Sequence, residues 1–174
     1  MSFIPFERSY WVIPNRLLAG EIPATRNEEE SIAKLSTLVN ANVNVIINLM
    51  EDDERNYRDE PFFDYSNHLN PENVVMHRMS IRDLSIPSKE HMLRILDLID
   101  EALNNNKVVY VHCWGGVGRT GTVVGCYLMR HGMANNANVI ETIEYLKRTT
   151  SIAERESPET EEQQQFLRNW QEHY

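Results

Sequence analysis

The sequence predicts an α/β fold, with a central, largely parallel sheet flanked by helices. Short apolar segments that favour strands alternate along the chain with longer segments whose apolar residues recur at helical spacing. Two of the short segments, Val43 to Leu49 and Val108 to Val111, are almost continuously apolar, which is typical of strands covered on both faces. The length of 174 residues suits one domain with a real core, so we expect a single domain over residues 1–174.

Five strands are expected, and the first two are joined by a turn at Pro14-Asn15. Residues 51–73 have weak periodicity and many polar groups, so they are expected to form a long loop with a helical turn near Arg55. Sites in such sheets lie at the carboxyl ends of the strands, which makes the residues after each strand the candidates for a site. The strands are Tyr10–Ile13, Leu17–Ala19, Val43–Leu49, Val74–Met79 and Val108–Val111.

The first two helices are predicted from their caps and from the apolar residues of one face. Thr25 with Glu28 forms a capping-box pattern at the start of the first helix. Ser88 caps the second helix, which runs to about Asn105. The apolar faces consist of Ile32, Leu35, Leu38 and Val39 in the first helix and of Met92, Ile95, Leu96 and Ile99 in the second.

Three further helices are expected in the second half of the chain. An apolar helix over Gly118–His131 is closed by Gly132. The segment Asn138–Thr149 is amphipathic. The last helix is predicted to open at Ser157-Pro158, with Ser as the N-cap and Pro at the first helical position.

Composition excludes several classes of partner. The net charge is −9 and no cluster of Lys and Arg is present, so neither a nucleic acid nor a membrane is an expected partner. The two cysteines suggest neither a disulfide framework nor a zinc site, and no apolar run is long enough for a signal peptide or a membrane span. We therefore expect a cytoplasmic protein without a metal site. A monomer with no cofactor is also expected.

The segment from His112 to Gly121, HCWGGVGRTG, lies between a predicted buried strand and an apolar helix. Its glycines allow the chain to curl, so that successive N–H groups at the helix N-terminus point at one spot. The helix dipole adds positive potential there, and the planar guanidinium of Arg119 can bind two phosphate oxygens. The segment therefore predicts a binding site for a phosphate-sized anion.

Cys113 begins this loop and is expected to act as a nucleophile. A helix N-terminus and a nearby cation favour the thiolate, which is the reactive form of a cysteine. Thr120 carries a hydroxyl that can donate to the sulfur and help it to leave in a second step.

The segment resembles the motif of cysteine-based protein tyrosine phosphatases, His-Cys-x-x-Gly-x-Gly-Arg-Thr-Gly, at every fixed position. The spacing of the loop resembles that of compact dual-specificity members, and the resemblance covers about Tyr10 to Trp170. It implies a phosphatase that forms a cysteinyl-phosphate and uses no metal. It also implies that His112 supports the loop and that the phosphate is bound by Trp114, Gly115, Gly116, Val117, Gly118 and Arg119.

Members of this family use a loop aspartate as general acid, and the best match is Asp83. It follows a predicted strand and precedes a helix cap, on a loop at the same end of the sheet as Cys113. Asp52 and Asp53 also follow a strand and are the reserve candidates. Family members position the second-step water with a glutamine, and here Gln163 shares a helical face with Phe166, Leu167 and Trp170.

Several residues that could draw attention are assigned no chemistry. Cys126 lies about two turns into the helix that follows the loop, so core packing is expected. The run Arg55-Asn56-Tyr57-Arg58 faintly resembles a phosphotyrosine-recognition loop but lies elsewhere along the chain. The aromatic residues Phe62, Phe63 and Tyr65 are expected to pack within their loop.

The expected substrate is a phosphorylated protein or peptide, with phosphotyrosine preferred and phosphoserine or phosphothreonine left open. Because the loop contains no lysine, a phosphoinositide is a weaker candidate. A nucleotide or an RNA end as substrate also stays open, as does a catalytically silent phosphate-binding module.

Overall fold

The computed structural model describes residues 3–173. Five strands form one sheet in the order β1-β2-β5-β3-β4; β1 and β2 are antiparallel, and every other neighbouring pair is parallel. The predicted α/β class with a largely parallel sheet is confirmed. The strands are β1 (Ser9–Ile13), β2 (Leu17–Gly20), β3 (Val43–Asn48), β4 (Val75–Arg78) and β5 (Val108–His112).

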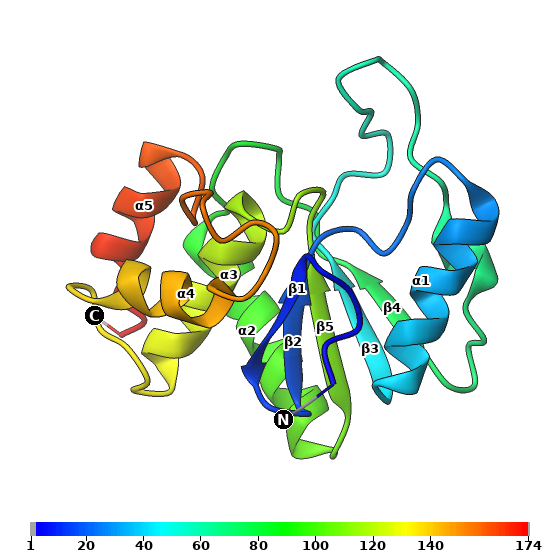
Figure 1. Ribbon diagram of the computed structural model, residues 1–174. Helices are drawn as coiled ribbons and strands as arrows, with labels where there is room; N and C mark the ends of the chain where they lie inside the picture. The colour runs from blue at the N-terminus through cyan, green and yellow to red at the C-terminus, as the bar shows by residue number, and fades with distance from the viewer. Residues whose placement is uncertain (1–2, 174) are drawn as a thin grey trace.

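Helices cover both faces of the sheet (Figure 1). One face is covered by α1, and the other by α2 to α5, so that an apolar core lies on each side. The predicted core residues Met92, Ile95, Leu96 and Ile99 of the second helix are fully buried. The helices are α1 (Glu28–Asn40), α2 (Lys89–Asn104), α3 (Gly118–Arg130), α4 (Val139–Lys147) and α5 (Glu161–Arg168). Within residues 3–173, no helix is long and apolar enough to cross a membrane.

The start of α1 differs from the prediction. Asn27, not Thr25, is the N-cap, because its side chain accepts the N–H of Glu30. The predicted face is partly wrong as well, since Ile32 and Val39 are 41% and 51% exposed. Ser31 is buried in their place, together with Leu35 and Leu38, and its hydroxyl donates to the Asn27 carbonyl.

The last helix begins later than predicted. Its N-cap is Thr160, which exchanges the two hydrogen bonds of a capping box with Gln163. Ser157 does not cap it, because the Ser157 hydroxyl donates to the carbonyl of Val117. The single turn of 3-10 helix in the 51–73 loop lies at Tyr65–His68 and not near Arg55.

Candidate active site

The site lies where the carboxyl ends of β2, β5, β3 and β4 meet at one edge of the sheet. Backbone hydrogen bonds tie the segments that follow these strands to one another. Leu49 N–H donates to the carbonyl of His112, and Ile81 N–H donates to that of Leu49, each at 2.9 Å. The segments after three strands are therefore locked in one arrangement.

Groups outside the loop Cys113–Gly118 hold three of its carbonyl groups. In a trans peptide the C=O and the following N–H point in opposite directions, so the next amide faces away from each of these partners. No side chain caps α3 at Val117, which leaves the helix N-terminus open to an anion. The bonds run from His112 Nδ1 to the Cys113 oxygen (2.8 Å), from Ile22 N–H to the Trp114 oxygen (3.0 Å) and from the Ser157 hydroxyl to the Val117 oxygen (2.8 Å).

Gly116 is required by the close approach of the loop to the end of β2. Its φ angle is 74°, which favours glycine. A Cβ atom there would lie 2.5 Å from the carbonyl carbon of Gly20 and 2.6 Å from the nitrogen of Glu21. Gly116 therefore shapes the loop, while Trp114, Gly115 and Gly118 line the cavity in front of it.

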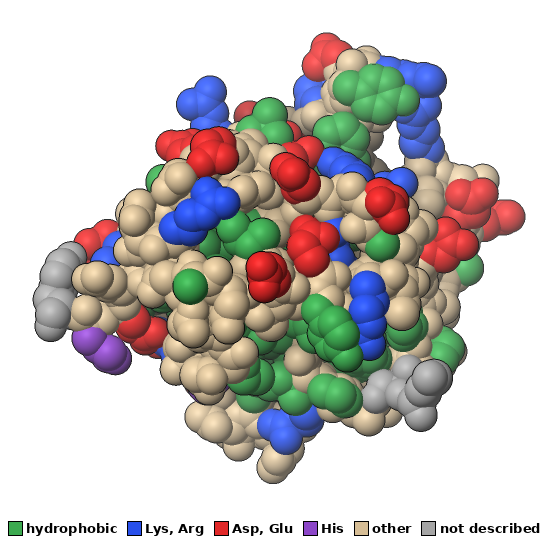
Figure 2. All heavy atoms as spheres, turned by 60° about the vertical axis from the view of Figure 1, so that its left-hand side comes forward, with side chains coloured by type: hydrophobic (Ala, Val, Ile, Leu, Met, Phe, Trp, Pro, Cys, Tyr) green, Lys and Arg blue, Asp and Glu red, His purple; other side chains and the backbone are tan. Residues whose placement is uncertain are grey.

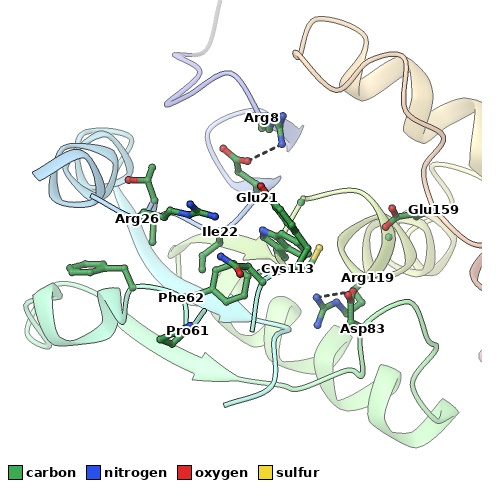
Figure 3. Close-up of a pocket in the computed structure, with 18 of the residues that line it drawn as sticks. Arg8, Glu21, Ile22, Arg26, Pro61, Phe62, Asp83, Cys113, Arg119 and Glu159 are labelled. Carbon is green, nitrogen blue, oxygen red and sulfur yellow. Dashed lines mark ion pairs between the residues drawn. The ribbon is translucent and has the colours of Figure 1, made fainter. Parts of the chain in front are cut away.

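Cys113 lies at the floor of a cavity of about 600 Å³ (Figure 3). The residue is 3% exposed, and its sulfur accepts a hydrogen bond from the Thr120 hydroxyl at 3.1 Å. Asp83 and Arg119 line the same cavity. The structure therefore brings together four of the five residues that the sequence predicted to be catalytic.

The guanidinium of Arg119 is held by two carboxylates. Glu54 binds it in a bidentate pair with both distances at 2.7 Å, and Asp83 Oδ1 lies 3.0 Å from Nη2 (Figure 3 shows the Asp83 pair). Nη1 also donates to the carbonyl of Ile81 at 3.0 Å. Burial alone would lower the pKa of Arg119, but its hydrogen bonds to Glu54 and the charges of Cys113, Glu54 and Asp83 outweigh burial and raise that pKa. The guanidinium of Arg119 therefore stays charged and is held in one orientation by its carboxylate partners.

Glu54 is the functional residue that the sequence prediction missed. The two reserve acids, Asp52 and Asp53, precede it directly, but the acidic partners of Arg119 are Glu54 and Asp83. Asp52 instead pairs with Arg78 at 2.6 Å. A run of four acidic residues after a strand was a visible signal, but only the fold shows which of them reaches Arg119.

His112 supports the loop as an uncharged side chain. Burial, aided by the positive charges of Arg78 and Arg119, lowers its pKa from 6.5 to about 3. Since the Cys113 carbonyl can only accept, Nδ1 is the protonated nitrogen, and Nε2 accepts from the Tyr65 hydroxyl at 2.5 Å. Tyr65, buried in the 51–73 loop, is thereby connected to the backbone of the nucleophile.

One wall of the cavity is aromatic. Trp114 stacks with Tyr57 at 6.4 Å between ring centroids and 21° between planes, and it meets the edge of Phe62 at 5.4 Å. All three line the cavity. Tyr57 is 75% exposed and belongs to a segment that projects from the body of the molecule, with hydrophobic, basic and acidic side chains at its tip (Figure 2). The structure thus places Tyr57 and Phe62 at the site, contrary to the prediction that they play no part there.

Gln163 lies behind the loop. It is fully buried, and its side-chain amide lies close to Gly118 without lining the cavity. Its oxygen accepts the N–H groups of Glu159 and Thr160, and its nitrogen donates to the carbonyl of Ser85 at 3.1 Å. These bonds connect α5 to the segment that carries Asp83.

Cys126 is fully buried in α3, and burial raises the pKa of its thiol well above the usual value. Both cysteines are free. In the part of the chain that the structure describes, no group of three or more His, Cys, Asp and Glu side chains is placed to hold a metal ion.

Comparison with known proteins agrees with this geometry. Residues 23–133 match the family described as "Tc-R-P: Polymorphic toxin system, DSP-PTPase phosphatase". Dual specificity protein phosphatase CDC14B of Mus musculus is 33% identical over 128 residues, which are 70% of this chain and 24% of that protein. The chain therefore spans about a quarter of the length of this relative. The uncharacterized protein MJECL20 of Methanocaldococcus jannaschii is 37% identical over 87 residues, which are 50% of this chain and 53% of that protein.

Solved structures give the same answer for the fold. Tk-PTP in its active form has a TM-score of 0.68 at 25% identity, and the match covers 93% of this chain and 95% of that one. PTPMT1 in complex with PI(5)P has a TM-score of 0.68 at 19% identity, covering 92% of each chain. Since the match to the family extends over more than half of the chain, the chain belongs to this DSP-PTPase phosphatase family and is a dual-specificity-like member of the cysteine-based protein tyrosine phosphatase superfamily.

Proposed function

We propose that this chain hydrolyses phosphate monoesters of proteins, with phosphotyrosine preferred, through a cysteinyl-phosphate intermediate. The observation that carries the proposal is the shared cavity of Cys113, Arg119 and Asp83 in front of an uncapped helix N-terminus. The nucleophile, the anion-binding groups and the proton donor are thereby within reach of a single phosphate group.

In the first step the sulfur of Cys113 attacks phosphorus and the P–O bond to the leaving group breaks. Arg119 and the loop amides bind the three equatorial oxygens, which carry the developing charge. Asp83, entering in its protonated form, gives its proton to the leaving oxygen. The ion pair between Asp83 and Arg119 supports this role, because it brings the Asp83 carboxyl within 3.0 Å of the side chain proposed to bind the phosphate.

In the second step a water attacks the phosphorus of the intermediate and gives a proton to the carboxylate of Asp83. The P–S bond breaks, and the Thr120 hydroxyl, 3.1 Å from the sulfur, stabilises the departing thiolate. For Gln163 to hold that water, as the sequence predicts, its side chain would have to leave Glu159, Thr160 and Ser85 and turn into the cavity. Inorganic phosphate then leaves and the free enzyme is restored.

The aromatic wall supports phosphotyrosine as the preferred substrate. Trp114, Tyr57 and Phe62 offer ring faces and edges beside the phosphate site, where the phenyl ring of a phosphotyrosine would lie. Extra phosphates of an inositol ring would need free cations at the rim. The four other cations that line the cavity are each paired with a carboxylate, which reduces the positive potential that they offer: Arg8 and Lys34 with Glu21, Arg26 with Glu60 and Arg155 with Glu159.

The test is hydrolysis of phosphotyrosine, phosphoserine and phosphothreonine peptides by the wild type, Cys113→Ser and Cys126→Ser, in the presence of a chelator. We expect the wild type and Cys126→Ser to turn over phosphotyrosine and Cys113→Ser to bind the peptide without turnover. If Cys113→Ser keeps activity near that of the wild type, Cys113 is not the nucleophile. If no peptide is cleaved, phosphoinositides, nucleotides and RNA ends are assayed next, and a lack of activity on these as well would indicate a binding module.

A further inference from the structure

Ser157, in the segment between α4 and α5, connects that segment to the phosphate loop. The residue is fully buried, and its hydroxyl donates to the carbonyl of Val117 at 2.8 Å. Its own N–H donates to Oε1 of Glu144, also at 2.8 Å. Ser157 is therefore fixed to α4 through its backbone and holds the loop through its side chain.

The anchor of Ser157 on α4 is itself rigid. Oε2 of Glu144 pairs with Nζ of Lys147 at 2.6 Å, and the Lys147 side chain is fully buried. Nζ also donates to the carbonyls of Ile152 and Ala153, at 3.2 and 2.9 Å. A buried ammonium group with this many acceptors clamps the segment before Ser157 onto α4.

A second observation comes from α3. A Cβ atom at Gly121 would lie 2.2 Å from the Ser157 hydroxyl oxygen, whereas its next contact, with Pro158, would be an ordinary 3.4 Å. The last glycine of the sequence motif therefore makes room in this chain for the hydroxyl of Ser157. The hydroxyl and the glycine form one packed unit behind the loop.

We propose that Ser157 is a positioning residue for phosphate binding, because its hydroxyl holds the Val117 carbonyl so that the Gly118 N–H points into the phosphate site. The peptide between the two residues is planar, so fixing one end of it fixes the other. Val117 is the N-cap of α3 and has no side-chain cap, and its carbonyl otherwise accepts the Gly121 N–H at 3.2 Å. This inference shares one premise with the proposed function, namely that the loop Cys113–Gly118 binds the phosphate group of the substrate.

The first test compares Ser157→Ala with Ser151→Ala, an exposed serine of the same segment. We expect Ser157→Ala to reduce kcat/KM for a phosphotyrosine peptide and to weaken inhibition by orthovanadate by the same factor, roughly three- to tenfold, as for the loss of one hydrogen bond. Ser151→Ala should match the wild type. Unchanged vanadate inhibition and kcat/KM in a folded Ser157→Ala would overturn the proposal.

The second test separates positioning from general loosening of the fold, and it needs no turnover. In the Cys113→Ser background, inorganic phosphate is titrated and the amide shifts of the loop are followed by NMR. Adding Ser157→Ala should reduce the phosphate-induced shift of the Gly118 amide while those of Trp114 and Gly115, whose preceding carbonyls have other partners, are retained. A uniform loss across the loop, or none, would refute the role assigned to Ser157.

Two outcomes must be kept distinct. If the wild type binds phosphate but cleaves no substrate, the proposed function fails and the NMR test of Ser157 still decides the inference. If Ser157→Ala does not fold, Ser157→Cys, which keeps a small buried side chain with a weaker donor, is measured against the same criterion.

Discussion

Among single residues, Arg119 sets the chemistry of the site, because its charge is buried and oriented before any substrate arrives. Its side chain is 1% exposed, and its guanidinium donates hydrogen bonds to both carboxylate oxygens of Glu54. A buried arginine without such a partner would be costly and poorly ordered. Glu54 thus keeps the phosphate-binding side chain in place, although it competes with the substrate for its N–H groups.

Removing the carboxylate of Glu54 should therefore impair turnover. We expect Glu54→Gln to lower kcat/KM for a phosphotyrosine peptide by about tenfold to a hundredfold, the value of a charge-assisted hydrogen bond. The control is Asp53→Asn at the neighbouring exposed acid. Steady-state kinetics measure this effect. Higher activity in Glu54→Gln would mean that the competition of Glu54 with the substrate for the N–H groups of Arg119 outweighs the benefit of orienting Arg119.

His112 makes a prediction about acid stability. The folded protein binds a proton at this ring only near pH 3, whereas an unfolded histidine does so near 6.5. Between these values the unfolded state holds more protons, so the free energy of unfolding must fall as the pH decreases from about 6.5 to about 3. The contribution is at most about 1.4 kcal/mol for each pH unit.

The measurement is denaturant unfolding of the wild type and of His112→Gln at several pH values. We expect a shallower loss of stability in the variant, although it is less stable than the wild type at pH 7. Parallel curves for the two proteins would show that His112 does not titrate differently on folding.

Among the elements, the 51–73 loop contributes most beyond the motif segment, since it supplies Glu54, Tyr65 and two residues of the aromatic wall. Its projecting part (Figure 1, between β3 and β4) contains an isolated bridge between Arg55 and Pro61. The Tyr65 hydroxyl, bonded to His112, fixes the far end of the loop beneath the nucleophile. The loop is therefore anchored at its base and exposed at the tip that carries Tyr57.

This arrangement predicts that Tyr57 and Phe62 favour aromatic substrates. We expect Tyr57→Ala and Phe62→Ala each to reduce kcat/KM for a phosphotyrosine peptide by roughly three- to tenfold, the value of one aromatic pair, and to affect a phosphoserine peptide less. Tyr145→Ala, at a tyrosine that is 63% exposed and does not line the cavity, is the matched control. Equal losses of kcat/KM on both peptides would show that the aromatic wall does not select phosphotyrosine over phosphoserine.

Elements with strong periodicity or buried apolar runs were predictable, and those decided by distant contacts were not. The core residues of α2 and its cap at Ser88 follow from the sequence pattern alone. The start of α5 does not, because the hydroxyl of Ser157 is used by Val117, 40 residues away. The same holds for the site: the loop from Cys113 to Thr120 is contiguous, whereas Glu54 reaches Arg119 across 65 residues.

At the scale of the whole molecule, the helices on the two faces of the sheet determine which side chains are exposed to solvent. The net charge is −9, and acidic side chains are spread over the face shown in Figure 2 between Lys and Arg side chains. The overall field therefore does not attract a phosphate dianion, and binding depends on the local loop amides and on Arg119. The same layering places one cysteine at the floor of an open cavity and the other inside the core.

This difference predicts the reactivity of the two thiols. Cys113 lines an open cavity, whereas Cys126 is fully buried and its pKa is raised by burial. Alkylation of Cys126 therefore requires unfolding, which costs about 5 kcal/mol or more, so iodoacetamide should modify it at least about a thousandfold more slowly than Cys113. Mass spectrometry of native and urea-unfolded protein measures both rates, and orthovanadate should protect Cys113 alone. Comparable rates in the native protein would mean that the core around α3 opens far more readily than its packing implies.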